Sequence, residues 1–178
     1  MWLSGLIDFN APLPDDFRTR LHAITDSCKT PREKVAKIYN LLRTDTRYVS
    51  IQLGIGGFRP IDAVKTCKLR FGDCKGLSHF MYAMLHEVGI PAVYTVISTD
   101  RKDFYHDFTS IGQQNHAIVQ IPLPSDTLWI ECTAPQLPLG YVHSSIAGHE
   151  ALLVKPGMGI ITRLPQYADE ETFHNVTY

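Results

Sequence analysis

The chain has 178 residues, of which 44% are hydrophobic and 20% are charged, and its formal net charge is -1. This length supports one well-buried core and is short for two full domains. The near-balance of charge excludes the broad positive field that attracts nucleic acid or anionic lipid, and no apolar run approaches the roughly 18 to 20 residues that span a bilayer. We therefore expect no nucleic-acid partner and no direct membrane insertion. The opening residues lack the basic and apolar regions of a signal peptide, which indicates either a cytosolic protein or a fragment of a longer chain.

Three helices are predicted in the first half of the chain. Residues 1–14 contain two prolines and show no period, as is typical of a lead-in segment. Apolar side chains at spacings of three and four predict a helix over residues 15–27, and a capping box with proline at the first helical position predicts a second over 31–44. The third helix begins at Cys74 and ends before Gly89.

A glycine-rich run, residues 54–57, follows a brief extended segment at residues 48–51. A phosphate-binding loop would need the lysine and hydroxyl of a P-loop, or a complete G-x-G-x-x-G between a strand and a helix, and neither pattern is complete. We interpret the run as a surface turn.

The second half of the chain is predicted to form a sheet. Short segments rich in β-branched or aromatic residues and separated by turn residues predict five strands, at residues 92–99, 116–121, 127–132, 151–154 and 160–164. Residues 100–115 show no period and form the longest predicted loop. Helices first and strands later predict an α+β domain in which the helices pack on an antiparallel sheet. We place this domain at residues 15–165, followed by a C-terminal tail at 166–178.

Cys74 is the cysteine whose position favours chemistry. The thiolate is the nucleophilic form of cysteine, and the N–H groups at the start of a helix stabilise that anion. Asp73 is placed to cap the helix, and Gly72 would let the backbone turn tightly before it. The alternative is that Cys74 is only a small buried hydrophobic residue. The other three cysteines are interpreted as structural.

An imidazole and a carboxylate are predicted to meet on a hairpin. Residues 122–125 are interpreted as a four-residue loop, and pairing of Ile121 with Asp126 then places His116 directly opposite Glu131. The same register gathers apolar side chains on the other face of the hairpin. A carboxylate bonded to one ring nitrogen fixes the tautomer, and the other nitrogen can take a cysteine proton. The alternative is a stabilising surface pair without a catalytic role.

Further side chains are candidates for other roles. Tyr48, Gln113 and Gln114 are candidates for the second oxyanion or substrate-binding donor, beside the backbone N–H of the cysteine. His79 and His86 lie on one predicted helix but have no partners at metal-site spacing, so we expect no metal and no other cofactor. A metal site built on histidine and cysteine is kept as an alternative hypothesis.

Four motifs occur in the order seen in bacterial transglutaminase-like domains: Arg47-Tyr48-Val49-Ser50-Ile51, Phe71-Gly72-Asp73-Cys74-Lys75-Gly76, Asn115-His116-Ala117 and Leu128-Trp129-Ile130-Glu131-Cys132-Thr133. The chain resembles these domains over residues 34–164. The resemblance implies a papain-like fold with a catalytic triad of Cys74, His116 and Glu131. Aspartate is more common at the third position, so Glu131 departs from the wider pattern by one methylene. The resemblance also implies an extracytoplasmic location and a longer chain with an additional β-rich domain.

These observations together predict cysteine-dependent acyl transfer or hydrolysis at a carboxamide or peptide bond through a thioester intermediate. The expected partner is a protein, a peptide or another amide-containing substrate. An amine acceptor would make the enzyme a transglutaminase and water would make it an amidase or protease, and the sequence does not choose between them. The alternative is a catalytically silent domain that binds peptide or glycan.

Overall fold

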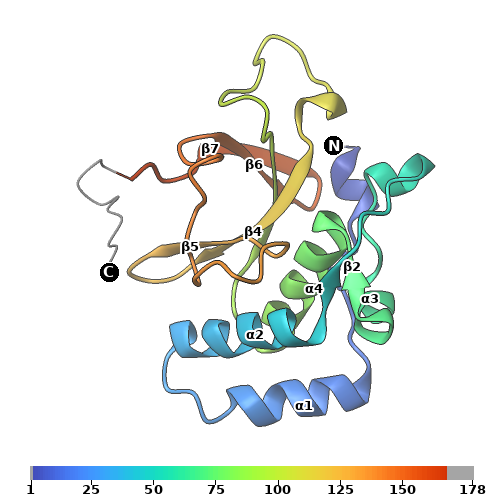
Figure 1. The fold of residues 1–178 in the computed structure, drawn as a ribbon, viewed down its shortest axis with the longest axis vertical. Helices are drawn as coiled ribbons and strands as arrows, with labels where there is room; N and C mark the ends of the chain where they lie inside the picture. The colour runs from blue at the N-terminus through green and yellow to red at the C-terminus, as the bar shows by residue number, and fades with distance from the viewer. Residues whose placement is uncertain (1, 168–178) are drawn as a thin grey trace, which may run out of the picture.

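The helices pack against one face of a five-stranded antiparallel sheet in the computed structural model, which describes residues 2–167 (Figure 1). The predicted α+β class is confirmed. The opposite face of the sheet is covered by the segment that follows β5, which buries Val142 and Ile146 against Ile97, Ile118 and neighbouring side chains of the sheet. Within the described residues, no helix combines the length and the apolar character that crossing a membrane requires.

The first two helices are α1, Asp15–Thr25, and α2, Pro31–Asp45, and they lie side by side (Figure 1). The predicted capping box of α2 is present, because the Thr30 hydroxyl accepts a hydrogen bond from the Glu33 N–H at 3.2 Å and the Glu33 carboxylate accepts one from the Thr30 N–H at 3.4 Å. Helix α1 ends two residues earlier than the sequence predicts.

Helix α4, Cys74–Glu87, is the central element of the fold. It contacts β4 on one side and α2 and α3 on the other, and apolar side chains such as Leu77, Phe80 and Met84 are buried around most of its circumference. A helix that is apolar nearly all round must be enclosed. Burial of α4 on both sides therefore determines where its first residue, Cys74, lies relative to the sheet.

The sheet has the strand order β5-β4-β3-β6-β7, and every neighbouring pair is antiparallel. All five predicted strands are present, with ends that differ by at most two residues: β3 Val93–Ile97, β4 His116–Pro122, β5 Thr127–Ile130, β6 Glu150–Lys155 and β7 Met158–Arg163. The loop between β3 and β4 extends beyond the end of the sheet (Figure 1).

The predicted register of the β4–β5 hairpin is wrong by two residues. Ile121 pairs with Leu128, and the chain reverses more tightly than expected, with the Leu123 N–H donating to the Asp126 carbonyl at 2.7 Å. Proline at position 124 presets the backbone angle that such a short turn needs, so the loop is shorter than the four residues assumed. Because the error is an even number of residues, every side chain keeps its predicted face.

Helix α3 and the pairing of β1 with β2 were not predicted, although the extended segment predicted at residues 48–51 overlaps β1 at Tyr48. Helix α3, Ala63–Leu69, is capped by the Asp62 carboxylate, which accepts a hydrogen bond from the Lys65 N–H at 2.7 Å. Strand β1, Arg47–Tyr48, pairs in parallel with β2, Phe71–Gly72. Both strands are only two residues long, too short for a periodic signal. This pairing anchors the chain immediately before Cys74.

The segment predicted as a lead-in packs against the core. It contains a short 3-10 helix, η1, at Leu3–Leu6, and Leu3 and Ile7 are buried in one cluster with Cys74 and Tyr94. Most of the predicted C-terminal tail, residues 168–178, lies outside the described residues.

Candidate active site

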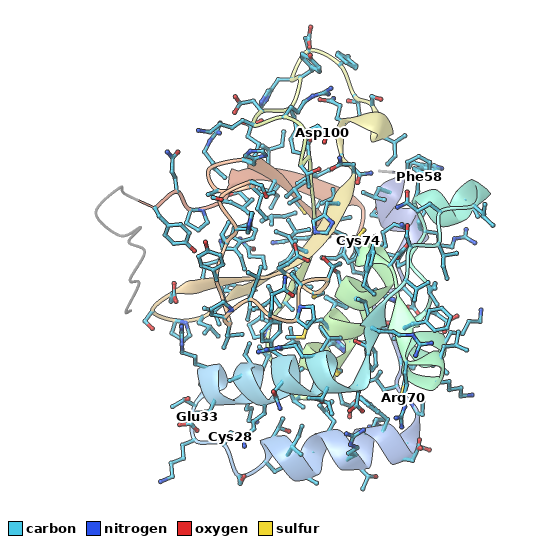
Figure 2. All side chains as sticks on the ribbon, viewed as in Figure 1. Cys28, Glu33, Phe58, Arg70, Cys74 and Asp100 are labelled. Atoms are coloured by element: carbon cyan, nitrogen blue, oxygen red, sulfur yellow. The ribbon has the colours of Figure 1, made fainter. Side chains whose placement is uncertain are left out.

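Cys74 is the first residue of α4 and lies in the interior of the molecule, between the sheet and the segment that carries Phe58 (Figure 2). Asp73 caps the helix as predicted, accepting a hydrogen bond from the Gly76 N–H at 2.9 Å. The predicted reason for glycine at position 72 is wrong, since its backbone does not take a positive φ. A Cβ there would lie 3.3 Å from the Leu77 nitrogen, so Gly72 permits close approach of β2 to the helix start.

A buried ion pair stands beside the cysteine. The Lys75 ammonium contacts the Asp73 carboxylate at 2.5 Å, and their side chains are only 9% and 2% exposed. The ammonium balances a carboxylate that would otherwise place a negative charge next to a thiolate. No role was predicted for Lys75 from the sequence.

His116, the first residue of β4, is hydrogen-bonded through Nε2 to Glu131 Oε2 at 2.7 Å. The two side chains are 16% and 13% exposed. Glu131 follows directly after β5, and its other oxygen accepts hydrogen bonds from the Thr133 N–H at 2.8 Å and the Thr133 hydroxyl at 2.6 Å. The glutamate is therefore held from both sides. Thr133 was not singled out from the sequence.

Electrostatics favour the ionised forms of this pair. Burial raises the pKa of Glu131, but hydrogen bonding and attraction to His116, with the two Thr133 hydrogen bonds, outweigh it and lower the pKa below its ordinary value. Burial likewise disfavours the imidazolium of His116, yet hydrogen bonds to Cys74 and Glu131 raise its pKa to about 10. With Nε2 engaged by Glu131, Nδ1 is the ring nitrogen left for the cysteine.

A hydrogen bond between the helix and the sheet sets the approach of Cys74 to His116. The Ser78 hydroxyl, one turn after Cys74 and fully buried, donates to the carbonyl of Ala117 at 3.0 Å. Ala117 is the residue after His116, so this bond ties α4 to β4 next to Cys74 and His116. The presence of a small polar residue, Ser78, on the apolar face of the predicted helix is the sequence signal that could have indicated this buried hydrogen bond.

Cys74 opens into a cleft of about 300 Å³. The cleft is lined by Gln52, Gly54, Gly57, Phe58, Cys74, Lys75, Gln114, Asn115 and His116. The glycine-rich run predicted as a surface turn forms a 3-10 helix, η2, at Gly54–Gly57, which contributes to one wall of this cleft.

Of the three candidate donors, the structure brings Gln114 to this cleft. Tyr48 is about half exposed on β1, and its backbone pairs with Gly72. The Gln113 amide is engaged by the loop before it, since it bonds the backbone of Tyr105 and Phe108. Gln52, which also lines the cleft, was not considered from the sequence.

The surroundings of the other cysteines and of His79 indicate structural roles. All four cysteines are free, and burial raises the pKa values of Cys67 and Cys132, which favours their thiol forms. His79 bonds the backbone carbonyls of Ile61 and Asp8 through its two ring nitrogens. Across residues 2–167, no group of three or more histidine, cysteine, aspartate or glutamate side chains could hold a metal ion.

Comparison with known proteins identifies the family. A family model described as the transglutaminase-like superfamily matches residues 18–134, more than half of the chain. The chain belongs to the transglutaminase-like superfamily. No curated protein sequence matches this transglutaminase-like domain significantly.

Solved structures are similar to this transglutaminase-like domain. One is a "putative protease" from Parabacteroides distasonis, with a TM-score of 0.67 and 15% identity, covering 89% of this chain and 30% of that chain. Another is a "putative cysteine protease" from Cytophaga hutchinsonii, with a TM-score of 0.48 and 18% identity, covering 67% of this chain and 37% of that chain. The first likeness confirms the predicted fold. The domain spans about a third of the length of these two chains.

Proposed function

We propose that this domain catalyses acyl transfer or hydrolysis at a carboxamide or peptide bond. Cys74 is the nucleophile, His116 is the general acid and base, and Glu131 orients His116. The observation that carries the proposal is the placement of Cys74 at the start of α4, where it lines one cleft with an imidazole whose Nε2 lies 2.7 Å from a buried carboxylate. Membership of the transglutaminase-like superfamily supports the same chemistry.

The proposed reaction proceeds in two halves. The Cys74 thiolate forms a bond to the carbonyl carbon while an electron pair moves to the oxygen. Collapse of this intermediate breaks the C–N bond, and the amine leaves with the proton of the His116 imidazolium, so that a thioester remains on Cys74. Water or an amine then attacks the thioester and gives its proton to His116, and the C–S bond breaks. Water yields a carboxylic acid, and an amine yields a new amide.

Two donors are available for the oxygen that becomes negative. The backbone N–H of Cys74 lies in the first turn of α4, where N–H groups have no partner within the helix. We assign the second donor to Gln114, whose amide lines the cleft and uses one hydrogen to bond the Ile111 carbonyl at 3.2 Å. Donors that are already in place when the charge develops stabilise the transition state.

The glutamate at the third position was the reason to consider a catalytically silent, ligand-binding domain. The longer side chain nevertheless reaches His116, and Thr133 holds it there with two hydrogen bonds. This arrangement favours the enzyme over the silent domain. An extracytoplasmic location and an additional β-rich domain remain predictions from the resemblance.

The proposal is tested by the pH dependence of iodoacetamide labelling, with the labelled cysteine identified by mass spectrometry. We expect Cys74 in the wild-type protein to react at pH 6, where an ordinary thiol is about 0.3% ionised. His116→Ala should shift labelling to alkaline pH, whereas Cys28→Ser, which alters a half-buried cysteine between α1 and α2, should leave it unchanged. The proposal is refuted if wild type and His116→Ala label Cys74 with the same pH profile.

Transferase and hydrolase activities are separated with one protein substrate. Wild-type protein is incubated with dimethylcasein, with and without dansylcadaverine. Fluorescence incorporated into the casein indicates an amine acceptor, and deamidation or new peptide termini found by mass spectrometry indicate water. We expect Cys74→Ala to abolish whichever product forms.

A further inference from the structure

A second cavity, of about 340 Å³, adjoins the Cys74 cleft. Gln114 lines both cavities, and the two residues that follow it, Asn115 and His116, line the cleft. The second cavity lies between the loop after β3 and the outer strands β6 and β7. We call it the aromatic pocket, and its main walls are Phe104, Tyr105, Phe108, Gln114, Leu152 and Ile161.

The aromatic pocket presents apolar surface to solvent. Tyr105 and Phe108 are 54% and 53% exposed, and their rings stack with centroids 5.4 Å apart. The Arg101 guanidinium lies 4.9 Å from the centroid of Tyr105. Grouped apolar side chains in contact with water are unfavourable, and a bound apolar group would remove that contact.

Buried polar groups hold the backbone of this loop in place. The Gln113 side chain accepts a hydrogen bond from the Tyr105 N–H at 2.6 Å and donates to the carbonyls of Tyr105 and Phe108 at 3.2 and 3.0 Å. The Glu150 carboxylate accepts a further bond from the Phe104 N–H at 2.8 Å. A binding surface that is already ordered loses less conformational entropy when a ligand binds.

One carboxylate, that of Glu150, pairs with two basic groups near the pocket. Among the described residues that line the pocket, His106 carries the basic side chain, and its Nε2 lies 3.0 Å from the Glu150 carboxylate. The same carboxylate group is 3.4 Å from the Arg163 guanidinium. The Arg101 guanidinium packs on the Tyr105 ring, and the largely apolar walls favour an uncharged apolar group.

We infer, on the basis of the proposed function, that the aromatic pocket binds an aromatic or large aliphatic side chain of a polypeptide substrate whose reacting carbonyl lies over Cys74. The sheet beside the pocket favours a polypeptide. Among the described residues β7 pairs with β6 alone, so its outward N–H and C=O groups can bond the part of an extended chain that lies beyond the pocket.

The layout of the sheet sets the position of that side chain. One strand, β3, separates β4, which carries His116, from β6, which carries Leu152 of the pocket. Two strand spacings amount to about 10 Å, and an extended chain rises about 3.3 Å per residue. The pocket therefore takes a side chain about three residues from the reacting carbonyl.

The probes are capped nonapeptides with a central glutamine in an alanine background, in which one phenylalanine is placed at each other position in turn. Binding to the full Cys74→Ala protein is measured by calorimetry, which does not depend on turnover. Deamidation and cleavage by wild-type protein are measured by mass spectrometry. A chitotetraose titration tests a glycan as the occupant.

We expect phenylalanine about three residues from the glutamine to bind about tenfold more tightly than alanine at that position. Phe108→Ala and Ile161→Ala should abolish this preference. Matched controls are Ile160→Ala, on the opposite face of β7 and 37% exposed against 45% for Ile161, and Tyr141→Ala, an exposed aromatic outside the pocket. Both controls should keep the preference.

Three results have distinct meanings. A phenylalanine preference that survives both pocket variants overturns the inference, even if turnover is normal. Chitotetraose binding that depends on Phe108, with no peptide preference, also overturns it, because the occupant is then a glycan. Pocket-dependent peptide binding supports the inference, and if no peptide is turned over by wild-type protein, that result counts against the proposed function alone.

Discussion

Replacing Glu131 with glutamine should reverse the proton positions on His116. The wild-type carboxylate uses Oε1 to accept two hydrogen bonds from Thr133 and Oε2 to bond His116 Nε2. Glutamine has a single acceptor oxygen, and the Thr133 N–H can only donate. The amide oxygen of Glu131→Gln must therefore face Thr133, and its NH₂ group must face His116.

An NH₂ group donating to Nε2 requires a lone pair on that nitrogen, so the neutral ring carries its proton on Nδ1. Nδ1 then cannot accept the Cys74 proton. The variant also loses a hydrogen bond between charged groups worth about 1.5–3 kcal/mol, or roughly 10- to 150-fold. We expect alkylation of Cys74 at pH 6 to slow about 100-fold. Turnover should fall further, by on the order of 10⁴, as when the wrong tautomer is enforced in a serine protease triad.

The assay combines the rate of iodoacetamide labelling with nitrogen-15 NMR of the His116 ring, which reports the tautomer directly. Glu87→Gln is the matched control, because it alters another histidine–glutamate pair, His22 with Glu87, away from the Cys74 cleft. It should label at the wild-type rate. Wild-type labelling by Glu131→Gln at pH 6, or a neutral His116 that keeps its proton on Nε2, would refute the reasoning.

Three further predictions concern the surroundings of the cysteine. Ser78→Ala removes the buried hydrogen bond to Ala117, so it should lower the free energy of unfolding by about 1–2 kcal/mol and slow the labelling of Cys74 at pH 6. Lost stability with unchanged labelling would contradict a positioning role for Ser78. Lys75→Met leaves the Asp73 charge buried alone, so the free energy of unfolding measured in urea should fall by about 3–5 kcal/mol. Most of this stability should return when Asp73→Asn is added. A loss below about 1 kcal/mol would contradict the prediction. Because the folded pKa of His116 is raised to about 10, its contribution to stability is complete below about pH 6.5 and is lost as pH rises through about 10. Urea titrations across this range should therefore show a falling free energy of unfolding, and His116→Gln should reduce that fall.

Much of the candidate site followed from local patterns. The period of α4, the aspartate before it and the alternation of β4 and β5 depend on residues close together in the chain, and these features predicted a cysteine at a helix start and a histidine near a glutamate. The hairpin register was wrong, but an even error exchanges no faces, so the prediction that His116 meets Glu131 survived it.

The sequence by itself determined three of the helices, the five strands of the sheet and the buried faces of these elements, because these depend on the spacing of side chains along a few turns or strands. Only the tertiary structure decided that α4 meets β4 through Ser78 and Ala117, that Lys75 balances Asp73, and that Gln113 orders the loop over the outer strands. Ser78 and Ala117 are 39 residues apart in the chain. Contacts at such separations depend on how whole elements pack, and no local spacing specifies that packing.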